Sequence, residues 1–82
     1  MSMRRTTSAV ALPNYKVLFA YADGERRVFD MTPYLDKGIF RDLHDPRVFS
    51  SVRPAFDTIE WPNGADVSPE LLYRDSLPAT SE

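Results

Sequence analysis

The fold of this 82-residue chain is decided by the stretch Trp61-Pro62-Asn63-Gly64-Ala65-Asp66-Val67-Ser68-Pro69-Glu70-Leu71-Leu72-Tyr73. Asn63-Gly64 provides two residues that tolerate positive φ, which a type I′ turn requires. Ser68 is a preferred N-cap residue, and Pro69 suits the first position of a helix. The stretch therefore predicts a turn, a short strand over 65–67 and a helix that begins at Pro69.

The residues around this stretch extend the prediction. Glu70 places a negative charge in the first helical turn, where it complements the helix dipole. Val67 and Leu72 have the spacing of a hydrophobic staple. Pro78 cannot continue a helix, so we expect the helix to stop there. Upstream, apolar and polar residues alternate over 56–61, which predicts a strand.

A β-hairpin is predicted over residues 15–31. Large apolar side chains alternate from Tyr15 to Tyr21, Asp23-Gly24 fits a type I′ turn, and a second strand returns over 26–31. With Asp23 and Gly24 as the two loop residues, Phe19 pairs with Val28 and Leu18 with Phe29. Each face then carries a large apolar pair, so the hairpin needs cover on both sides, or on one side plus a partner chain.

The middle of the chain is predicted to form single helical turns. Thr32-Pro33 and Asp45-Pro46 are both start signals, and Gly38 is placed to end the first turn. Between them Ile39, Phe40 and Leu43 have the spacing of one helical face.

These segments predict one α+β domain over residues 14–76. Its small, mostly antiparallel sheet consists of the hairpin and the two later strands, packed with short helical turns and the C-terminal helix. Residues 1–13 lack periodicity and are predicted to be a flexible arm, and residues 77–82 a polar tail.

Composition narrows the class of protein. Without cysteine the chain forms no disulfide and no thiolate zinc site. A net charge of -2 argues against a binder that neutralises many phosphates. The longest apolar run, Val17 to Ala22, is far short of the roughly 20 residues that span a bilayer. We expect a cytoplasmic protein without a membrane segment.

No enzyme signature is present, and we expect neither a cofactor nor a metal. Ser50 and Ser51 lack a Gly-x-Ser-x-Gly surround, and the chain has one histidine. Asp42, His44 and Asp45 are the one cluster with metal-ligand chemistry, but ligands within four residues rarely converge from one loop, and Asp45 already serves as a cap.

The candidate recognition surface consists of Trp61, Asp66, Glu70 and Tyr73. Aromatic residues anchor many protein interfaces, and carboxylates around an indole suit a basic partner. The alternative is a polar rim around a half-buried indole. For Asp66 two roles stay open: accepting backbone N–H groups of the turn or helix, or binding a basic residue of a partner.

Ten aromatic residues in so short a chain suggest that some reach the surface, where they would suit a protein partner or a homodimer. A crowded monomeric core is the equal alternative. Arg4 and Arg5, on an arm without acidic residues, support the alternative of nucleic-acid binding.

The order of these features also forms a family pattern: Tyr15 to Tyr21 with Asp23-Gly24, then Asp30, Leu35, Gly38-Ile39-Phe40, Leu43 and Phe49, and finally Ile59-Glu60 followed by the stretch from Trp61 to Tyr73. Over about residues 15 to 75 the chain resembles the small bacterial family called domain of unknown function 2442. The resemblance implies a compact α+β domain without catalytic residues to carry over. It also implies relatives encoded beside small toxin-like proteins and relatives with a downstream helix-turn-helix. We therefore expect a non-catalytic interaction module that self-associates or binds a small genetically linked partner, with an antitoxin-like role.

Overall fold

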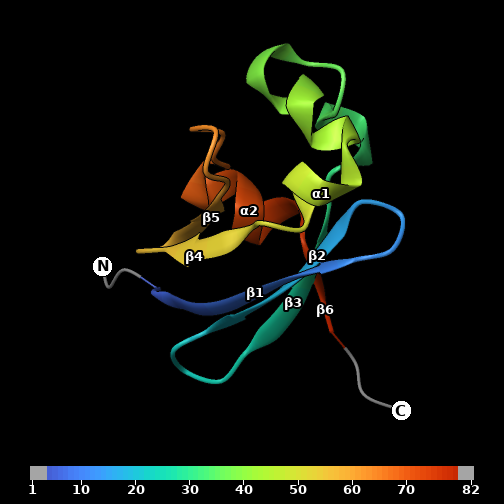
Figure 1. The fold of residues 1–82 in the computed structure, drawn as a ribbon. Coiled ribbons are helices and arrows are strands. Elements are labelled where there is room, and N and C mark those ends of the chain that lie inside the picture. Colours follow the sequence, from blue (N-terminus) through green and yellow to red (C-terminus); the bar gives the residue numbers. More distant parts are fainter. Residues whose placement is uncertain (1–3, 80–82) are drawn as a thin grey trace.

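A computed structural model of the chain describes residues 4–79 and has the expected α+β architecture (Figure 1). Its larger sheet is antiparallel, with strand order β1-β2-β3-β6. These strands are β1 (Thr6–Leu12), β2 (Lys16–Tyr21), β3 (Arg26–Asp30) and β6 (Leu77–Pro78). A second, two-stranded sheet consists of β4 (Arg53–Ala55) and β5 (Thr58–Glu60). The helical elements are two 3₁₀ helices, η1 (Thr32–Tyr34) and η2 (Gly38–His44), and two α-helices, α1 (Pro46–Phe49) and α2 (Pro69–Asp75).

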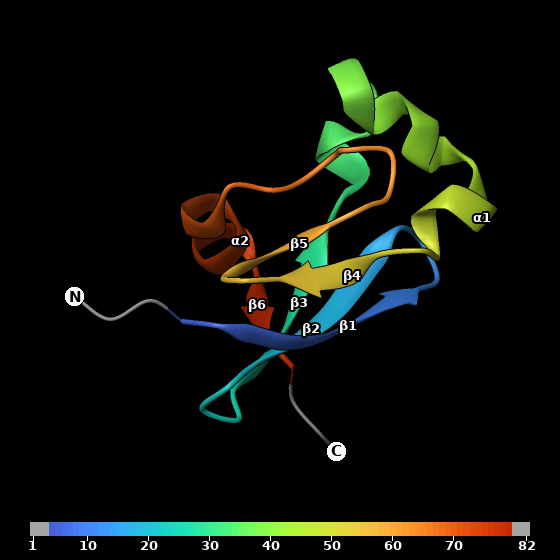
Figure 2. The ribbon, with the colours of Figure 1, turned by 60° about the vertical axis from the view of Figure 1, so that its left-hand side comes forward.

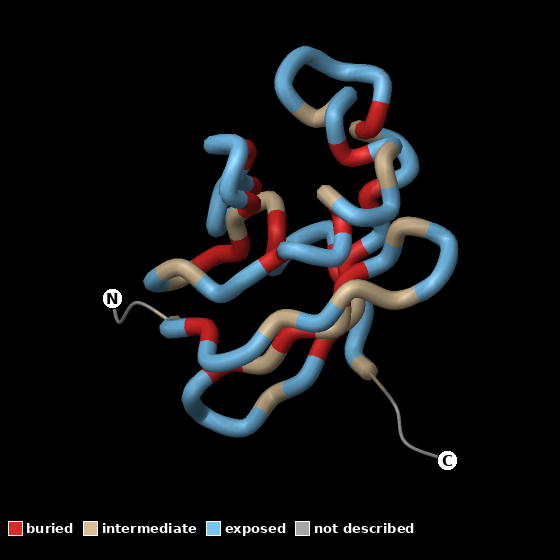
Figure 3. The backbone as a smooth tube through the Cα atoms, in the orientation of Figure 1, coloured by how far each residue is buried: buried red, intermediate tan, exposed pale blue. Residues whose placement is uncertain are grey.

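The core lies on one side of the larger sheet. Side chains alternate along β2, so Val17, Phe19 and Tyr21 are buried on the core side. The helices and the small sheet lie over this side (Figures 1 and 2), and the buried segments gather between the two layers (Figure 3). The largest fully buried side chains are Trp61, Phe19, Phe29, Met31, Leu43, Ile59, Leu72 and Val17.

The predicted arm over residues 1–13 is wrong for residues 6–12, which form β1 at the edge of the larger sheet. Its inward positions are alanines: Ala9 pairs with Phe19 and Ala11 with Val17, and both pack against the core. Alanine is depleted in strands, so this alternation gave no strand signal. Pairing with β2 overrides the weak local preference. Residues 1–3 lie outside the described residues.

The predicted hairpin exists, but its register is shifted by one residue. Val17 pairs with Phe29, Leu18 with Val28 and Phe19 with Arg27. Gly24 has φ +96°, whereas Asp23 is not among the residues with positive φ, so the turn is not type I′. Tyr21 instead receives a hydrogen bond from Gly24 N and donates to Glu25 O, which closes a three-residue loop over 22–24. Only one apolar pair, Leu18 and Val28, therefore faces outward.

The turn at Asn63-Gly64 is built in the same way. Gly64 has φ +94°, Trp61 N donates to Ala65 O at 2.8 Å, and the Asn63 side chain accepts from Ala65 N at 3.0 Å. Asp23 does the same for Glu25 N, also at 3.0 Å. Each turn thus combines a side-chain acceptor with a glycine at positive φ, the arrangement of a type I turn with a bulge.

The predicted strand over 65–67 is a single bridge between Asp66 and Glu60, and β5 is shorter than the predicted strand over 56–61. The partner of β5 is β4, where Pro54 pairs with Ile59. Proline tolerates an edge strand because its missing N–H then breaks no ladder. The predicted single sheet is therefore wrong for this part of the chain, because β5 pairs with β4 in a separate sheet.

The helix start signals have mixed outcomes. Asp45 accepts from Arg47 N at 2.9 Å and caps α1, as predicted. Before η1, in contrast, the N-cap position is Met31, and Thr32 lies inside the helix. Gly38, with φ +50°, begins η2 instead of ending a turn.

The C-terminal helix starts where predicted but ends earlier. Ser68 is at the N-cap of α2 without a side-chain cap bond, and its carbonyl accepts from Leu72 N at 2.9 Å. The helix ends at Asp75, and Leu77–Pro78 pairs with β3, so the predicted polar tail begins with a strand. Residues 80–82 lie outside the described residues. Within residues 4–79 no helix is long and apolar enough to cross a membrane.

Candidate interaction surface

Trp61 is a core residue and not a recognition residue. Its side chain is 1% exposed, its Nε1 donates to Phe49 O at 3.0 Å, and its ring stacks on that of Phe49. A buried indole needs a partner for its N–H, and the end of α1 provides one. The prediction of Trp61 as part of a recognition surface is therefore wrong.

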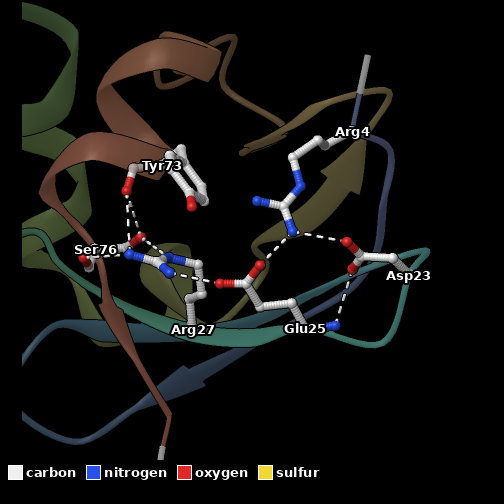
Figure 4. A network of polar contacts seen from close by, with 6 residues as sticks. All are labelled: Arg4, Asp23, Glu25, Arg27, Tyr73 and Ser76. Atoms are coloured by element: carbon white, nitrogen blue, oxygen red, sulfur yellow. Dashed lines mark hydrogen bonds and ion pairs between the residues drawn. The ribbon is translucent and has the colours of Figure 1, made fainter. Parts of the chain in front are cut away.

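The other three predicted residues are exposed but do not converge on one site. Asp66 lies before α2, and its carboxylate accepts no hydrogen bond from any described residue, so the backbone-accepting role is not observed. Glu70 is exposed in the first turn of α2. Tyr73 belongs to a different cluster at the far end of this helix (Figure 4).

That cluster holds Arg4 in place. Arg4 Nη2 lies 2.8 Å from Asp23 Oδ2 and donates also to Glu25 (Figure 4). Its guanidinium lies 4.3 Å from the ring centroid of Tyr21 and 4.9 Å from that of Tyr73. Arg4 thus joins the start of the chain to the β2–β3 turn and to α2 through ion pairs and cation–π contacts.

Arg27 continues the same cluster into the core. It is buried, and its Nη1 lies 2.6 Å from Glu25 Oε2. Its Nε donates to Ser76 Oγ at 2.6 Å and its Nη2 to Ser76 O at 2.8 Å, while the guanidinium covers the ring of Tyr73. These bonds satisfy a buried cation and fix the end of α2 against β3.

The cluster shifts the acidity of its members. The pKa of Glu25 is lowered because Arg4 and then Arg27 donate hydrogen bonds to its carboxylate. The pKa of Asp23 is lowered because its carboxylate accepts from Glu25 N and then from Arg4. Burial raises the pKa of Tyr21. These shifts follow from structural pairing. The contacts of Arg4 connect the start of β1 to the β2–β3 turn and to α2. Of the two arginines predicted to bind nucleic acid, only Arg5 therefore remains available, and it is exposed.

Asp42, His44 and Asp45, the cluster with metal-ligand chemistry, each contact a different partner. His44 Nε2 lies 3.0 Å from Asp36, Asp45 caps α1, and Asp42 accepts from Asn63 at 3.4 Å. Within residues 4–79 no group of three or more His, Asp or Glu residues is placed to hold a metal ion.

The outer face of the larger sheet carries an apolar row that the sequence interpretation missed. Pairing aligns one residue from each strand: Val10 with Leu18, Leu18 with Val28, and Val28 with Leu77. Directly opposed residues lie on the same face, and this face is the one away from the core. Val10 is 53% exposed and Leu77 71% exposed, while Leu18 and Val28 are half-buried. The row therefore crosses the sheet and remains accessible to solvent.

Charges flank this apolar row on both sides. Along β3, Arg26 precedes Val28 by two residues and Asp30 follows it by two, so all three share the outer face. Lys16 lies opposite Asp30 on β2. The alternation around Val28 was readable in the sequence. Val10 and Leu77 were not, because they fell in the segments assigned to an arm and a tail.

A large exposed side chain at the tip of the β4–β5 hairpin was also missed. Phe56 is 78% exposed and has φ +53°, a region that bulky residues seldom adopt. Its carbonyl accepts from Thr6 N at 2.7 Å, so the tip is fixed to the start of β1.

The model of the family described as Protein of unknown function (DUF2442) matches residues 6–78. The chain belongs to this family. No curated protein and no solved structure matches it. Family membership agrees with the resemblance read from the sequence and assigns no biochemical role.

Proposed function

We propose that this member of the family is a non-catalytic protein-interaction module that self-associates through the outer face of its larger sheet. The observation that carries the proposal is the apolar row of Val10, Leu18, Val28 and Leu77. Contiguous apolar side chains across a whole sheet are a common feature of interaction sites, since burying them is favourable.

Charge complementarity supports a second copy as the occupant of this face. A two-fold axis that runs along the apolar row keeps each row residue over its own counterpart and reverses the strand direction. Arg26 of one copy then lies over Asp30 of the other, and the reverse pair forms by symmetry. Face-to-face sheets pack about 10 Å apart, which long side chains can bridge.

The size of the face predicts a weak dimer. The four strands have 7, 6, 5 and 2 residues. With a rise of about 3.3 Å per residue and a spacing of about 4.8 Å between strands, they cover roughly 300 Å². Stable interfaces bury about 800 Å² on each partner. We therefore expect a dissociation constant of about 10 to 1,000 µM.

Sedimentation of the purified chain over this concentration range tests the proposal. The wild type is expected to shift from monomer to dimer, and the double variant Val10→Lys, Leu77→Lys to stay monomeric because it places four cations in the interface. Ile39→Lys is the matched control. The exposed fraction of Ile39, 49%, is similar to the 53% of Val10, but Ile39 lies on η2 and not on the sheet.

Three outcomes decide between occupants. Dimerisation lost in the double variant and kept in Ile39→Lys supports the proposal. A wild type that is monomeric at 1,000 µM contradicts self-association. If such a monomer binds the product of a neighbouring gene through the same face, the module instead serves a small linked partner, as in an antitoxin-like role.

A further inference from the structure

A narrow cleft on the core side of the molecule is separate from the outer face. It has a volume of about 140 Å³ and lies between the segment from the end of β3 to η2 and the start of α2. The apolar walls include Phe29, Met31, Tyr34, Phe40 and Leu71, and Asp66 lines the cleft as well. We call it the Asp66 cleft. Because Phe29 faces the core side of the sheet, a partner on the outer face leaves this cleft open.

The carboxylate of Asp66 has no donor among residues 4–79. Most exposed carboxylates in the same range are engaged, for instance Asp36 with His44 at 3.0 Å and Asp75 with Tyr34 Oη at 2.9 Å. Glu70 is exposed and also has no donor in this range, but it does not line the cleft. Asp66 is exposed while the walls next to it are buried or half-buried. The cleft therefore combines an apolar interior with one available negative charge.

This combination selects the chemistry of a ligand. Methylene groups gain from burial against the apolar walls, while an ammonium group gains a charge-assisted bond to Asp66. Aromatic walls add to the preference for a cation over an anion. A neutral apolar chain would fill the cleft but leave the Asp66 carboxylate without a partner.

The volume narrows the choice further. Pockets for cofactors and metabolites start at about 300 Å³, more than twice the 140 Å³ found here. The space corresponds to about five water molecules at about 30 Å³ each. A lysine side chain also has about five non-hydrogen atoms, and the guanidinium of arginine makes a larger side chain.

We propose that the Asp66 cleft binds a lysine side chain presented by a partner protein. The apolar walls take its four methylene groups, and Asp66 takes its ammonium group at the mouth. The site does not depend on self-association through the outer face, so each proposal is tested independently of the other.

Nuclear magnetic resonance titration of the full-length chain tests this site. The probe is Nα-acetyl-lysine N-methylamide, compared with the norleucine analogue, which has the same stem without the charge. We expect the lysine probe to shift backbone resonances of Asp66, Phe40 and Leu71 with millimolar affinity, and the norleucine probe to bind about fivefold more weakly. An exposed ion pair accounts for a difference of this size.

Asp66→Asn keeps the shape of the side chain and is expected to weaken lysine binding about fivefold, to the level of norleucine. Asp36→Asn is the control, because Asp36 is an exposed carboxylate outside the cleft. Equal binding of the two probes to the wild type would contradict the proposal. So would a variant at Asp66 that binds the lysine probe as tightly as the wild type does.

Discussion

At the scale of single residues, Phe56 is the clearest conflict between side chain and backbone. Its φ of +53° suits glycine, and 78% of the side chain is exposed, so little burial is lost on replacement. We expect Phe56→Gly to raise the free energy of unfolding by about 1 kcal/mol. Urea denaturation measures this change.

The matched variant for this prediction is Phe56→Ala, which removes the ring but keeps the Cβ that causes the strain. It is expected to show no gain in stability. If Gly and Ala variants unfold at the same urea concentration, strain at Phe56 is not the cause.

Single residues also show what local chemistry can predict. Asp45 could be identified as a cap because the side chain acts on Arg47 N, two residues away. The burial of Trp61 could not be predicted from local chemistry, because the acceptor of its N–H, Phe49 O, belongs to a separate helical turn. For Asp66 the sequence left two roles open, because its place in one cleft with Phe40 depends on tertiary packing that no local pattern encodes.

At the scale of elements, the cluster around Arg4 links the start of β1 to the β2–β3 turn. The pKa values of Glu25 and Asp23 are lowered in the fold, so these carboxylates stabilise it above their ordinary values of 4.5 and 3.8, and this contribution disappears as pH falls through the lowered values. Arg4→Gln removes the partner. We expect a lower melting temperature at pH 7 and a smaller difference from the wild type below about pH 4.

The neighbouring Arg5→Gln is the control for this prediction. Arg5 is exposed, and its backbone carbonyl, which survives the substitution, accepts from Ala22 N. Thermal unfolding followed by circular dichroism from pH 3 to pH 7 compares the three proteins. A gap between Arg4→Gln and the wild type that is as large at pH 3 as at pH 7 would rule out the ion pairs as its source.

Elements also show why the register could not be read from the sequence. Asp23-Gly24 and Asn63-Gly64 both suggest a two-residue loop, but in each only the glycine has positive φ, and a third residue joins the loop. A slip of one residue exchanges the faces of a strand. In the observed register Arg27, and not Val28, pairs with Phe19 on the core side, and Val28 pairs with Leu18 on the outer side.

At the scale of the whole molecule, the α+β class and the family could be predicted because the decisive stretch is local. The two edge strands of the larger sheet, β1 and β6, could not be predicted. Ala9 and Ala11 become strand residues only through pairing with β2, and Leu77 only through pairing with β3. The apolar row of the outer face depends on both edges, so the proposed interface emerged only from the complete sheet.

The proposed two-fold dimer makes a prediction about charge that no other occupant of the outer face makes. If Arg26 of one copy lies over Asp30 of the other, Arg26→Asp places like charges together and is expected to weaken dimerisation about fivefold to tenfold. The double variant Arg26→Asp, Asp30→Arg restores opposite charges across the axis and is expected to recover most of this loss. Asp30 also accepts from Thr32 N at 2.9 Å, so thermal unfolding must first establish that both variants are folded. Sedimentation equilibrium then measures the dissociation constants. Recovery requires the two residues to face each other between copies, whereas a double variant weaker than Arg26→Asp would place the two-fold axis elsewhere.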